Sequence, residues 1–164
     1  MTDALPTPFR GATATVLPAW IDHNGHMNVG YYGVAFDTAA GDWFRSFGFT
    51  REFRAQHQVS TFALESHLHF VREVKEGDPL RFEFRMIDLE AKRLHFYGEM
   101  FHGTEGYLAA TYESLSICMD MRTRRTAPFP QPLHDALARV HDAHRALPRP
   151  WQVGHVISVR PPRR

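Results

Sequence analysis

One apolar stripe constrains the fold of this chain more than any other feature. Between residues 29 and 47, apolar side chains recur at steps of three and four, which is the period of an α-helix. The members of the stripe are Val29, Tyr32, Gly33, Phe36, Ala40, Trp43, Phe44 and Phe47. Because the stripe is wide and aromatic, we expect a deeply buried helix, capped by Asn28 and ended by a left-handed turn at Gly48. Gly30 and Gly33 would weaken this helix, so we expect a strand or a ligand to approach its backbone closely there.

After residue 57 the apolar pattern changes to a period of two, which is typical of strands. The strand predicted at residues 61–70 has two distinct faces. One face holds Phe62, Leu64, Ser66, Leu68 and Phe70, and the other holds Thr61, Ala63, Glu65, His67 and His69. Further strands are predicted at 10–17, 80–86, 94–100 and 107–119, with turns at 76–79, 88–91 and 103–106. A linker with three prolines then precedes a terminal helix at 133–147.

This order of elements predicts an α+β fold. Strands joined by tight turns form an antiparallel sheet, and one long apolar helix needs such a sheet to wrap it. We expect residues 1–127 to form this domain, and residues 128–164 to add a proline-rich linker, a C-terminal helix and a basic tail that pack on it. At 164 residues the chain is short for two domains. One helix leaves sheet edges and a far face exposed, so pairing with a second copy is expected.

The composition excludes several classes of protein. The chain is 43% apolar and 23% charged, which is too apolar for disorder, and its net charge of +1 provides no field that recruits nucleic acid or a membrane. The single cysteine, Cys118, excludes an internal disulfide and fits a reducing compartment. No apolar run approaches the ~20 residues of a membrane helix, and residues 1–6 lack the features of a secretory signal. We therefore expect a soluble cytoplasmic protein. Its arginine-rich end is expected to be a solvated tail and holds Arg145, Arg149, Arg160, Arg163 and Arg164.

The polar side chains best suited to catalysis lie in the loop before the apolar helix. Residues 22–28 read Asp-His-Asn-Gly-His-Met-Asn, which places one carboxylate, two imidazoles and two carboxamides at a helix start. A carboxylate there can act as a base or a nucleophile, and the first free amides of the helix can hold a developing oxyanion. The alternative is structural, because such an aspartate often forms an Asx-turn or caps the helix. Since Asn28 already fills the cap position, we interpret Asp22 as the reactive member of an enzyme site.

Motifs beyond this loop carry a resemblance to a known family. They are residues 20–28, Tyr31-Tyr32, Phe36-Asp37, 64–68, 92–95 and 150–157. With the order of elements, they resemble the hotdog-fold acyl-CoA thioesterases of the 4-hydroxybenzoyl-CoA thioesterase type, and within them a bacterial branch linked to carnitine and betaine catabolism. Two positions depart from that branch: His23 stands where a tyrosine is expected, and Cys118 stands where a histidine is expected.

With this resemblance, each residue of the loop can be given a role. Asp22 is expected to attack the thioester carbonyl or to activate water, because the thiolate leaves readily once an oxygen nucleophile is supplied. His26 is expected to orient Asp22 or the substrate carbonyl, and Asn28 to hold the loop and cap the helix. For both, a purely structural role is the open alternative. The expected oxyanion donors are the backbone amides of Val29, Gly30 and Tyr31.

The polar face of the first long strand offers a second candidate base. Glu65, His67 and His69 share it, either as a wall of the active-site cleft or as solvent-facing residues of a half-exposed strand. Glu65 lies mid-strand among apolar neighbours, where an unpaired charge would be costly, so it is a candidate catalytic residue. His67 is a candidate substrate contact. His67 with His69 can bind zinc, but no third ligand accompanies them at diagnostic spacing, so no metal is expected.

Aromatic and cationic residues supply further candidate contacts to the substrate. Five aromatics can build a cage for a trimethylammonium acyl group through cation–π attraction, with plain core packing as the alternative. The five are Trp20, Tyr31, Tyr32, Phe36 and Trp43, of which Trp20 and Tyr32 are the main candidates. Arg93, with Lys92 and Arg72, can meet the phosphates of coenzyme A, or these three can be solvated turn residues.

These expectations combine into one function. The resemblance implies a homodimeric or homotetrameric thioesterase that hydrolyses a small, betainyl-CoA-like acyl-CoA to the free acid and CoA. No cofactor is expected, because coenzyme A is part of the substrate. One alternative is a hotdog enoyl-CoA hydratase or dehydratase, but those enzymes carry an Asp–Asn-Pro–His run, and no proline lies between Asp22 and His26. The other alternative, a non-catalytic acyl-CoA-binding domain, would not need a carboxylate beside the carbonyl.

Overall fold

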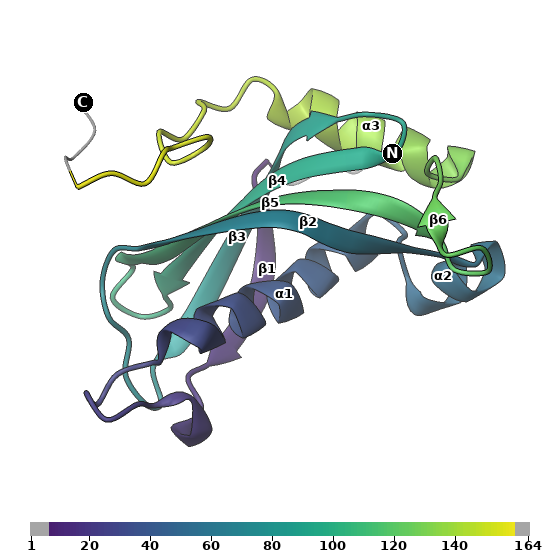
Figure 1. Ribbon diagram of the computed structural model, residues 1–164. Helices are drawn as coiled ribbons and strands as arrows, with labels where there is room; N and C mark the ends of the chain where they lie inside the picture. Colours follow the sequence, from purple (N-terminus) through teal and green to yellow (C-terminus); the bar gives the residue numbers. More distant parts are fainter. Residues whose placement is uncertain (1–6, 160–164) are drawn as a thin grey trace.

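The computed structural model describes residues 7–159, which form an antiparallel sheet curled around one long helix (Figure 1). The helices are α1 (Val29–Ser46), α2 (Arg51–His57) and α3 (Gln131–His144), with a 3₁₀ turn, η1 (Pro18–Trp20). The strands are β1 (Phe9–Thr15), β2 (Val59–Phe70), β3 (Pro79–Leu89), β4 (Arg93–His102), β5 (Leu108–Asp120) and β6 (Arg125–Thr126). Five strands follow the order β1-β3-β4-β5-β2, and β6 pairs with β5. The predicted α+β class, with a sheet wrapped around a central helix, is confirmed.

Helix α1 begins and ends where the local pattern predicts. Asn28 Oδ1 accepts a hydrogen bond from the Gly30 N–H at 3.0 Å, which caps the helix, and Gly48 follows its end with a φ of +95°. The expected close approach of a strand to the early glycines is wrong, and the other expectation, approach of a ligand, stays a prediction. A Cβ added to Gly33 would lie 3.8 Å from the Leu68 side chain, which is an ordinary van der Waals contact.

The apolar stripe of α1 packs into the concave face of the sheet. Phe36 and Trp43 are almost completely buried there, and Trp43 stacks on Phe84 with ring centroids 5.6 Å apart. The close backbone approach occurs on β4 instead. A Cβ added to Gly98 would lie 2.7 Å from Phe84 and 3.2 Å from Phe36, so only glycine leaves room for both rings.

Strand β2 lies at the edge of the sheet and contains a bulge that the alternation did not predict. The pairing with β5 shifts register between Ala63 and Glu65, so Leu64 is an extra residue and is 53% exposed. Phe62 therefore lies on the same face as Glu65. The predicted apolar face of this strand is wrong on that point.

Helix α2 was not predicted from the sequence. The Thr50 side chain caps it by accepting a hydrogen bond from the Phe53 N–H at 3.2 Å. The helix has seven residues, none of them fully buried, so it shows no apolar stripe. Short half-exposed helices of this kind leave little periodic signal.

The connection between β2 and β3 is the largest departure from the prediction. The turn at 76–79 suggested a hairpin, but β4 and β5 separate the two strands. Residues 71–78, the crossing connection, instead pass the start of α1. Met27 N–H donates to the Val74 carbonyl at 2.9 Å, and Val16 N–H donates to the Asp78 carbonyl at 3.0 Å. These bonds fix the crossing connection beside the loop that carries Asp22.

C-terminal residues cover parts of the sheet that α1 leaves open. Helix α3 packs against β3, and its His144 Nδ1 accepts a hydrogen bond from the Met86 N–H at 3.0 Å. The C-terminal segment, residues 148–157, then runs across the face opposite α1 (Figure 1). Of the arginine-rich end, Arg160, Arg163 and Arg164 lie outside the described residues.

Candidate active site

The loop that carries Asp22 is a tight turn closed by backbone hydrogen bonds. Gly25 N–H donates to the Asp22 carbonyl at 3.0 Å, and Asp22 N–H donates to the His26 carbonyl at 3.1 Å. Ile21 and Met27 form an antiparallel bridge across its base. Gly25 has a φ of +80°, a conformation that favours glycine. The loop therefore holds Asp22 firmly beside the start of α1.

The Asp22 carboxylate is oriented by one hydrogen bond and keeps free acceptor sites. It accepts a hydrogen bond from the Asn24 N–H at 2.8 Å, which is the Asx-turn that the structural alternative predicted. It forms no ion pair with any residue between 7 and 159. A carboxylate offers about four acceptor sites, so one backbone contact leaves most of them available to a substrate or a water.

Asp22 lines a pocket of about 300 Å³, the Asp22 pocket, between the start of α1 and the crossing connection. The lining residues are Asp22, His26, Met27, Val29, Tyr32, Phe70, Val71, Arg72 and Glu73. Tyr32 and Phe70 meet edge to face with ring centroids 5.0 Å apart. Burial raises the pKa of Tyr32, which keeps its phenol neutral. The Asp22 carboxylate and the aromatic pair of Tyr32 and Phe70 therefore line the same pocket.

Two of the three expected oxyanion donors are already engaged. The Gly30 N–H donates to Asn28 Oδ1 at 3.0 Å, and the Tyr31 N–H donates to the Asn28 carbonyl at 3.0 Å. The Val29 N–H has no acceptor among the described residues, and Val29 lines the Asp22 pocket. Val29 is therefore the amide available to a carbonyl oxygen. His26 also lines the pocket, and its Nδ1 lies 3.4 Å from the Met27 carbonyl oxygen.

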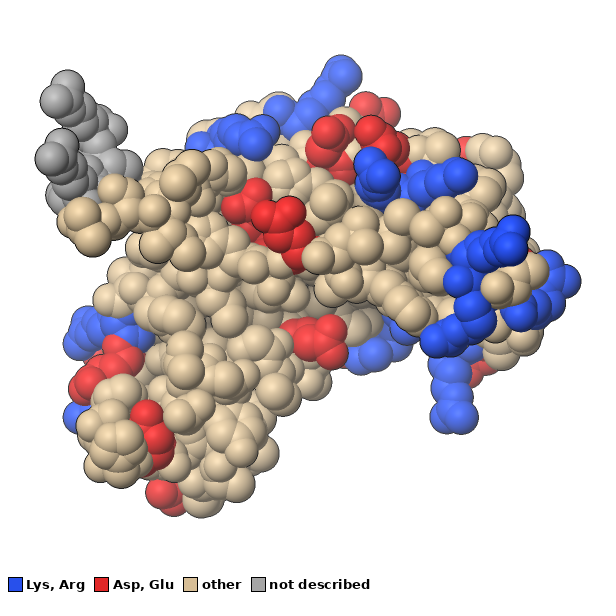
Figure 2. All heavy atoms as spheres, viewed as in Figure 1, with Lys and Arg blue, Asp and Glu red and all other residues tan. Residues whose placement is uncertain are grey.

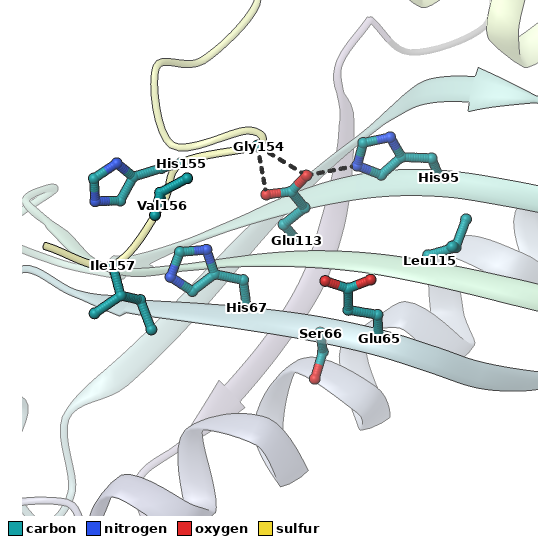
Figure 3. Close-up of a pocket in the computed structure, with 10 residues that line it drawn as sticks. All are labelled: Glu65, Ser66, His67, His95, Glu113, Leu115, Gly154, His155, Val156 and Ile157. Atoms are coloured by element: carbon teal, nitrogen blue, oxygen red, sulfur yellow. Dashed lines mark hydrogen bonds and ion pairs between the residues drawn. The ribbon is translucent and has the colours of Figure 1, made fainter. Parts of the chain in front are cut away.

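Glu65 and His67 do not line the Asp22 pocket. They line a second pocket of about 490 Å³, on the face of the sheet opposite α1 (Figure 3). We call this the outer pocket. Its lining residues are Glu65, Ser66, His67, His95, Glu113, Leu115, Gly154, His155, Val156 and Ile157. Figure 3 shows Glu65, His67 and Glu113 pointing to the same side, beneath the C-terminal segment, while Ser66 points away.

The two carboxylates of the outer pocket differ in their partners. Glu113 accepts hydrogen bonds from the Gly154 N–H at 2.9 and 3.1 Å, and its Oε1 lies 2.8 Å from His95 Nε2. Glu65 is exposed and forms no ion pair within the described part of the chain. The expectation that Glu65 carries a costly charge among apolar neighbours is therefore wrong, because the edge position of β2 leaves it in solvent.

The remaining predicted contacts are also dispersed. Trp20 stacks on Tyr31 with centroids 5.8 Å apart, and neither lines the Asp22 pocket. Phe36 and Trp43 belong to the core, so a five-membered aromatic cage is wrong and Tyr32 alone reaches the Asp22 pocket. Arg93 lines a small pocket of about 150 Å³ with His95 and other residues.

Sequence reasoning missed Phe70 and Glu73 as members of the Asp22 pocket. Both come from the end of β2 and the crossing connection, whose path no local pattern reveals. Cys118 is buried, and burial raises the pKa of its thiol to about 11, so it is not a nucleophile. Residues 7–159 contain no group of three His, Cys, Asp or Glu side chains that could hold a metal ion. No helix in the described range is long and apolar enough to span a bilayer.

Comparisons with known proteins agree on one family. A model of the thioesterase-like superfamily matches residues 16–137. The betainyl-CoA thioesterase of Pseudomonas aeruginosa is 35% identical over 90% of this chain and 93% of its own length. The L-carnitine dehydrogenase/betainyl-CoA thioesterase of Ruegeria pomeroyi is 31% identical over 84% of this chain, which spans only 28% of that longer protein. A hypothetical protein of Staphylococcus aureus, solved in complex with CoA, superimposes with a TM-score of 0.86 at 27% identity, covering 98% of this chain and 100% of its own.

Proposed function

This chain belongs to the thioesterase-like superfamily and is an acyl-CoA thioesterase, and we propose that Asp22 is the carboxylate that acts on the thioester. One observation carries the proposal. Asp22, His26 and the free Val29 amide line the same pocket at the N-terminus of α1. Among the candidate bases named from the sequence, only Asp22 has a helix amide beside it that can stabilise an oxyanion.

The reaction needs only water and the groups of this pocket. As a general base, Asp22 takes a proton from water while the water oxygen attacks the thioester carbonyl carbon. The carbonyl oxygen becomes an oxyanion that the Val29 N–H and the positive end of α1 stabilise. The C–S bond then breaks, and the thiolate of CoA takes the proton from Asp22. As a nucleophile, Asp22 would attack the carbonyl carbon directly and expel the CoA thiolate as the C–S bond breaks, which leaves a mixed anhydride. Water then hydrolyses the anhydride to the free acid and restores the Asp22 carboxylate, and the released proton goes to the thiolate.

His26 and Asn28 act on this centre indirectly. The Asn28 side chain holds the Gly30 N–H and so fixes the first turn of α1, which aims the Val29 amide. His26 contributes its backbone carbonyl to the loop and its ring to the pocket wall, where it orients the substrate. Both are positioning residues in this proposal.

We propose a small acyl group with a quaternary ammonium as the substrate class. The similarity to a betainyl-CoA thioesterase supports it. In the Asp22 pocket, the edge-to-face pair of Tyr32 and Phe70 offers aromatic surface, and Glu73 adds a carboxylate. A trimethylammonium group gains from both, through cation–π attraction and through charge.

We also propose that the enzyme is a homodimer or homotetramer. Among residues 7–159 the edge strand β2 has no neighbour on one side, and Leu64 and Phe70 on it and Val71 just after it are exposed. The Asp22 pocket opens at the end of this strand and is too small to enclose an acyl-CoA. A second copy paired along β2 would cover the edge and close the pocket.

A thiol-release assay tests the function at two levels. Betainyl-CoA is compared with tert-butylacetyl-CoA, which has the same shape without the charge. We expect faster turnover of the cationic substrate by the wild type, and loss of that preference in Tyr32→Leu. The Asp22→Asn variant should bind acyl-CoA without releasing thiol. Normal turnover by Asp22→Asn would refute the mechanism, whereas equal turnover of the two acyl groups would refute only the substrate class.

A further inference from the structure

One arginine lines the Asp22 pocket, and its position bears on which acyl groups the pocket accepts. Arg72 lies on the crossing connection and is the only Lys or Arg among the described residues that line the pocket. The lining also holds two carboxylates, Asp22 and Glu73. A guanidinium paired with these carboxylates would repel a cationic acyl group and attract an anionic one. The charge preference of the pocket therefore depends on where the Arg72 guanidinium is held.

The turn between β4 and β5, residues 103–107, holds the Arg72 guanidinium. The guanidinium carbon lies 3.8 Å from the ring centroid of Tyr107, which is a cation–π contact. A guanidinium nitrogen also lies 3.7 Å from a carboxylate oxygen of Glu105. No ion pair joins Arg72 to Asp22 in the described part of the chain. The charge of Arg72 is therefore engaged by the turn and not by Asp22.

The turn is held in place without help from the guanidinium. His102 is buried, and its Nδ1 accepts hydrogen bonds from the Thr104 and Glu105 N–H groups at 3.2 and 3.1 Å. The Gly103 N–H donates to the Pro79 carbonyl at 2.6 Å, which fastens the turn to the start of β3. The backbone that carries the two partner side chains therefore does not depend on the guanidinium.

The backbone of Arg72 is also fixed independently of its side chain. The Val71 and Arg72 N–H groups donate to the Ala109 carbonyl at 2.9 and 3.0 Å. The Tyr107 hydroxyl adds a hydrogen bond to the neighbouring Glu73 carbonyl at 3.0 Å. Substitutions in the turn that remove side-chain contacts therefore release the guanidinium, while the bonds to Ala109 keep the crossing connection in place.

A second cation on the crossing connection is engaged as well. Lys75 Nζ lies 3.6 Å from Glu73 Oε1, and Lys75 does not line the Asp22 pocket. Figure 2 shows Lys and Arg side chains beside Asp and Glu side chains at the end of the molecule where α1 starts, whereas Lys and Arg predominate at the β6 and α2 end. Asp22 forms no ion pair within residues 7–159, so an acyl group in the pocket meets an uncompensated carboxylate. This charge suits a cationic acyl group.

We propose that Tyr107 and Glu105 are positioning residues that keep the Arg72 guanidinium from pairing with Asp22, and that this arrangement makes the pocket favour a cationic acyl group over an anionic one. Tyr107 supplies an aromatic face and Glu105 a carboxylate, the two groups that attract a guanidinium most. This inference rests on the proposed function and names the residues that set the charge preference of the same site.

The first test releases the guanidinium. Tyr107→Leu/Glu105→Gln is assayed by thiol release with cationic betainyl-CoA, neutral tert-butylacetyl-CoA and anionic malonyl-CoA. Relative to the neutral substrate, we expect kcat/KM to fall about threefold or more for betainyl-CoA and to rise by a similar factor for malonyl-CoA. Glu105→Gln alone, at a side chain that is 60% exposed, should shift both ratios in the same directions without endangering the fold. Unchanged ratios, or equal losses on all three substrates, overturn the proposal.

The second test asks whether the effect passes through Arg72. Adding Arg72→Gln to the turn variant should restore both ratios at least to their wild-type values, which repair of a general packing defect would not do. Tyr107→Phe keeps the ring and removes only the hydroxyl bond to the Glu73 carbonyl, so it should keep the wild-type ratios. If Arg72→Gln does not restore the ratios, the turn acts by another route and the proposal fails.

Arg81 provides a matched control. Its guanidinium carbon lies 4.3 Å from the ring centroid of Phe101, and Arg81 does not line the Asp22 pocket. Phe101→Leu should therefore leave both ratios unchanged, and a shift as large as that of the turn variant would overturn the proposal. Equal turnover of betainyl-CoA and tert-butylacetyl-CoA by the wild type would refute the proposed substrate class, whereas the response of malonyl-CoA would still decide the role of the turn.

Discussion

The Asp22 pocket and the outer pocket contain the same kinds of side chain, and we propose that only the Asp22 pocket carries out hydrolysis. Each has carboxylates, at least one histidine and apolar walls. In the outer pocket, Glu113 is held by three hydrogen-bonding contacts and Glu65 lies in solvent. In the Asp22 pocket, the carboxylate has one backbone contact and a free helix amide nearby. The carboxylates of the two pockets therefore differ in their spare acceptor sites and in the donors beside them, and this difference is why we propose Asp22 as the reactive one.

The largest expected effect separates the two pockets by activity. Asp22→Asn should lower kcat by about 10²- to 10⁴-fold, since it removes the general base. Glu65→Gln should leave kcat within a few-fold of the wild type, because Glu65 is exposed and forms no ion pair within residues 7–159. Steady-state thiol release with both variants measures this. Comparable losses in the two variants would place Glu65 in the reacting centre.

Glu113→Gln should show what the outer pocket contributes instead. Its carboxylate binds the Gly154 N–H, so the variant should loosen the C-terminal segment by about 1.5 to 3 kcal/mol, the usual range for a charge-assisted hydrogen bond. Hydrogen exchange of residues 148–157 measures the loosening. Glu65→Gln is the matched control. A collapse of kcat with unchanged exchange would show that the outer pocket takes part in chemistry.

The caps of α1 and α2 allow a comparison of two variants whose expected losses of stability are equal and small. Asn28→Ala and Thr50→Ala each remove a side chain that accepts a hydrogen bond at a helix start, from Gly30 and Phe53 respectively. Each should cost about 1 kcal/mol of unfolding free energy. Only Asn28→Ala should also lower kcat, because its helix aims the Val29 amide. Equal kcat in both variants would reduce Asn28 to a purely structural cap.

The smallest expected effect is a pH dependence of local stability on the face of the sheet opposite α1. Burial, followed by His155 and His67, lowers the pKa of His69 from its ordinary value of 6.5. The unfolded chain then binds more protons than the folded one, so the stabilisation by neutral His69 is present above about pH 6.5 and lost as the pH falls below it. Exchange of the C-terminal segment, where Trp151 lies edge-on to His69 with centroids 5.1 Å apart, should rise on acidification. His69→Gln should weaken this dependence, while His134→Gln should retain it.

Local sequence patterns predicted α1, its cap at Asn28 and its end at Gly48, because each depends on residues within one or two turns. Helix α2 escaped prediction because its seven residues present no buried face. The bulge at Leu64 turned Phe62 to the other side of β2, and a period-two pattern carries no sign of an inserted residue.

The candidate site was predictable only in the part that lies along one segment. Asp22, His26 and Val29 were named from the loop and the helix start, and they do line one pocket. Phe70 and Glu73 join them through the path of the crossing connection, which depends on tertiary hydrogen bonds to Met27 and Val16. Glu65, whose side chain resembles a candidate base in the sequence, was separated from Asp22 by the topology of the sheet.

The crossing connection also separates the order of synthesis from the order in which the sheet can close. A nascent chain that has emerged through β3 already contains every residue of the Asp22 pocket. Strand β2 has no partner at that stage, because it pairs with β5, which is synthesised later. Contacts between segments this distant in the chain form slowly, and an unpaired strand edge invites aggregation meanwhile. Thioesterase activity should therefore appear only after β5 has been made and the whole sheet has closed.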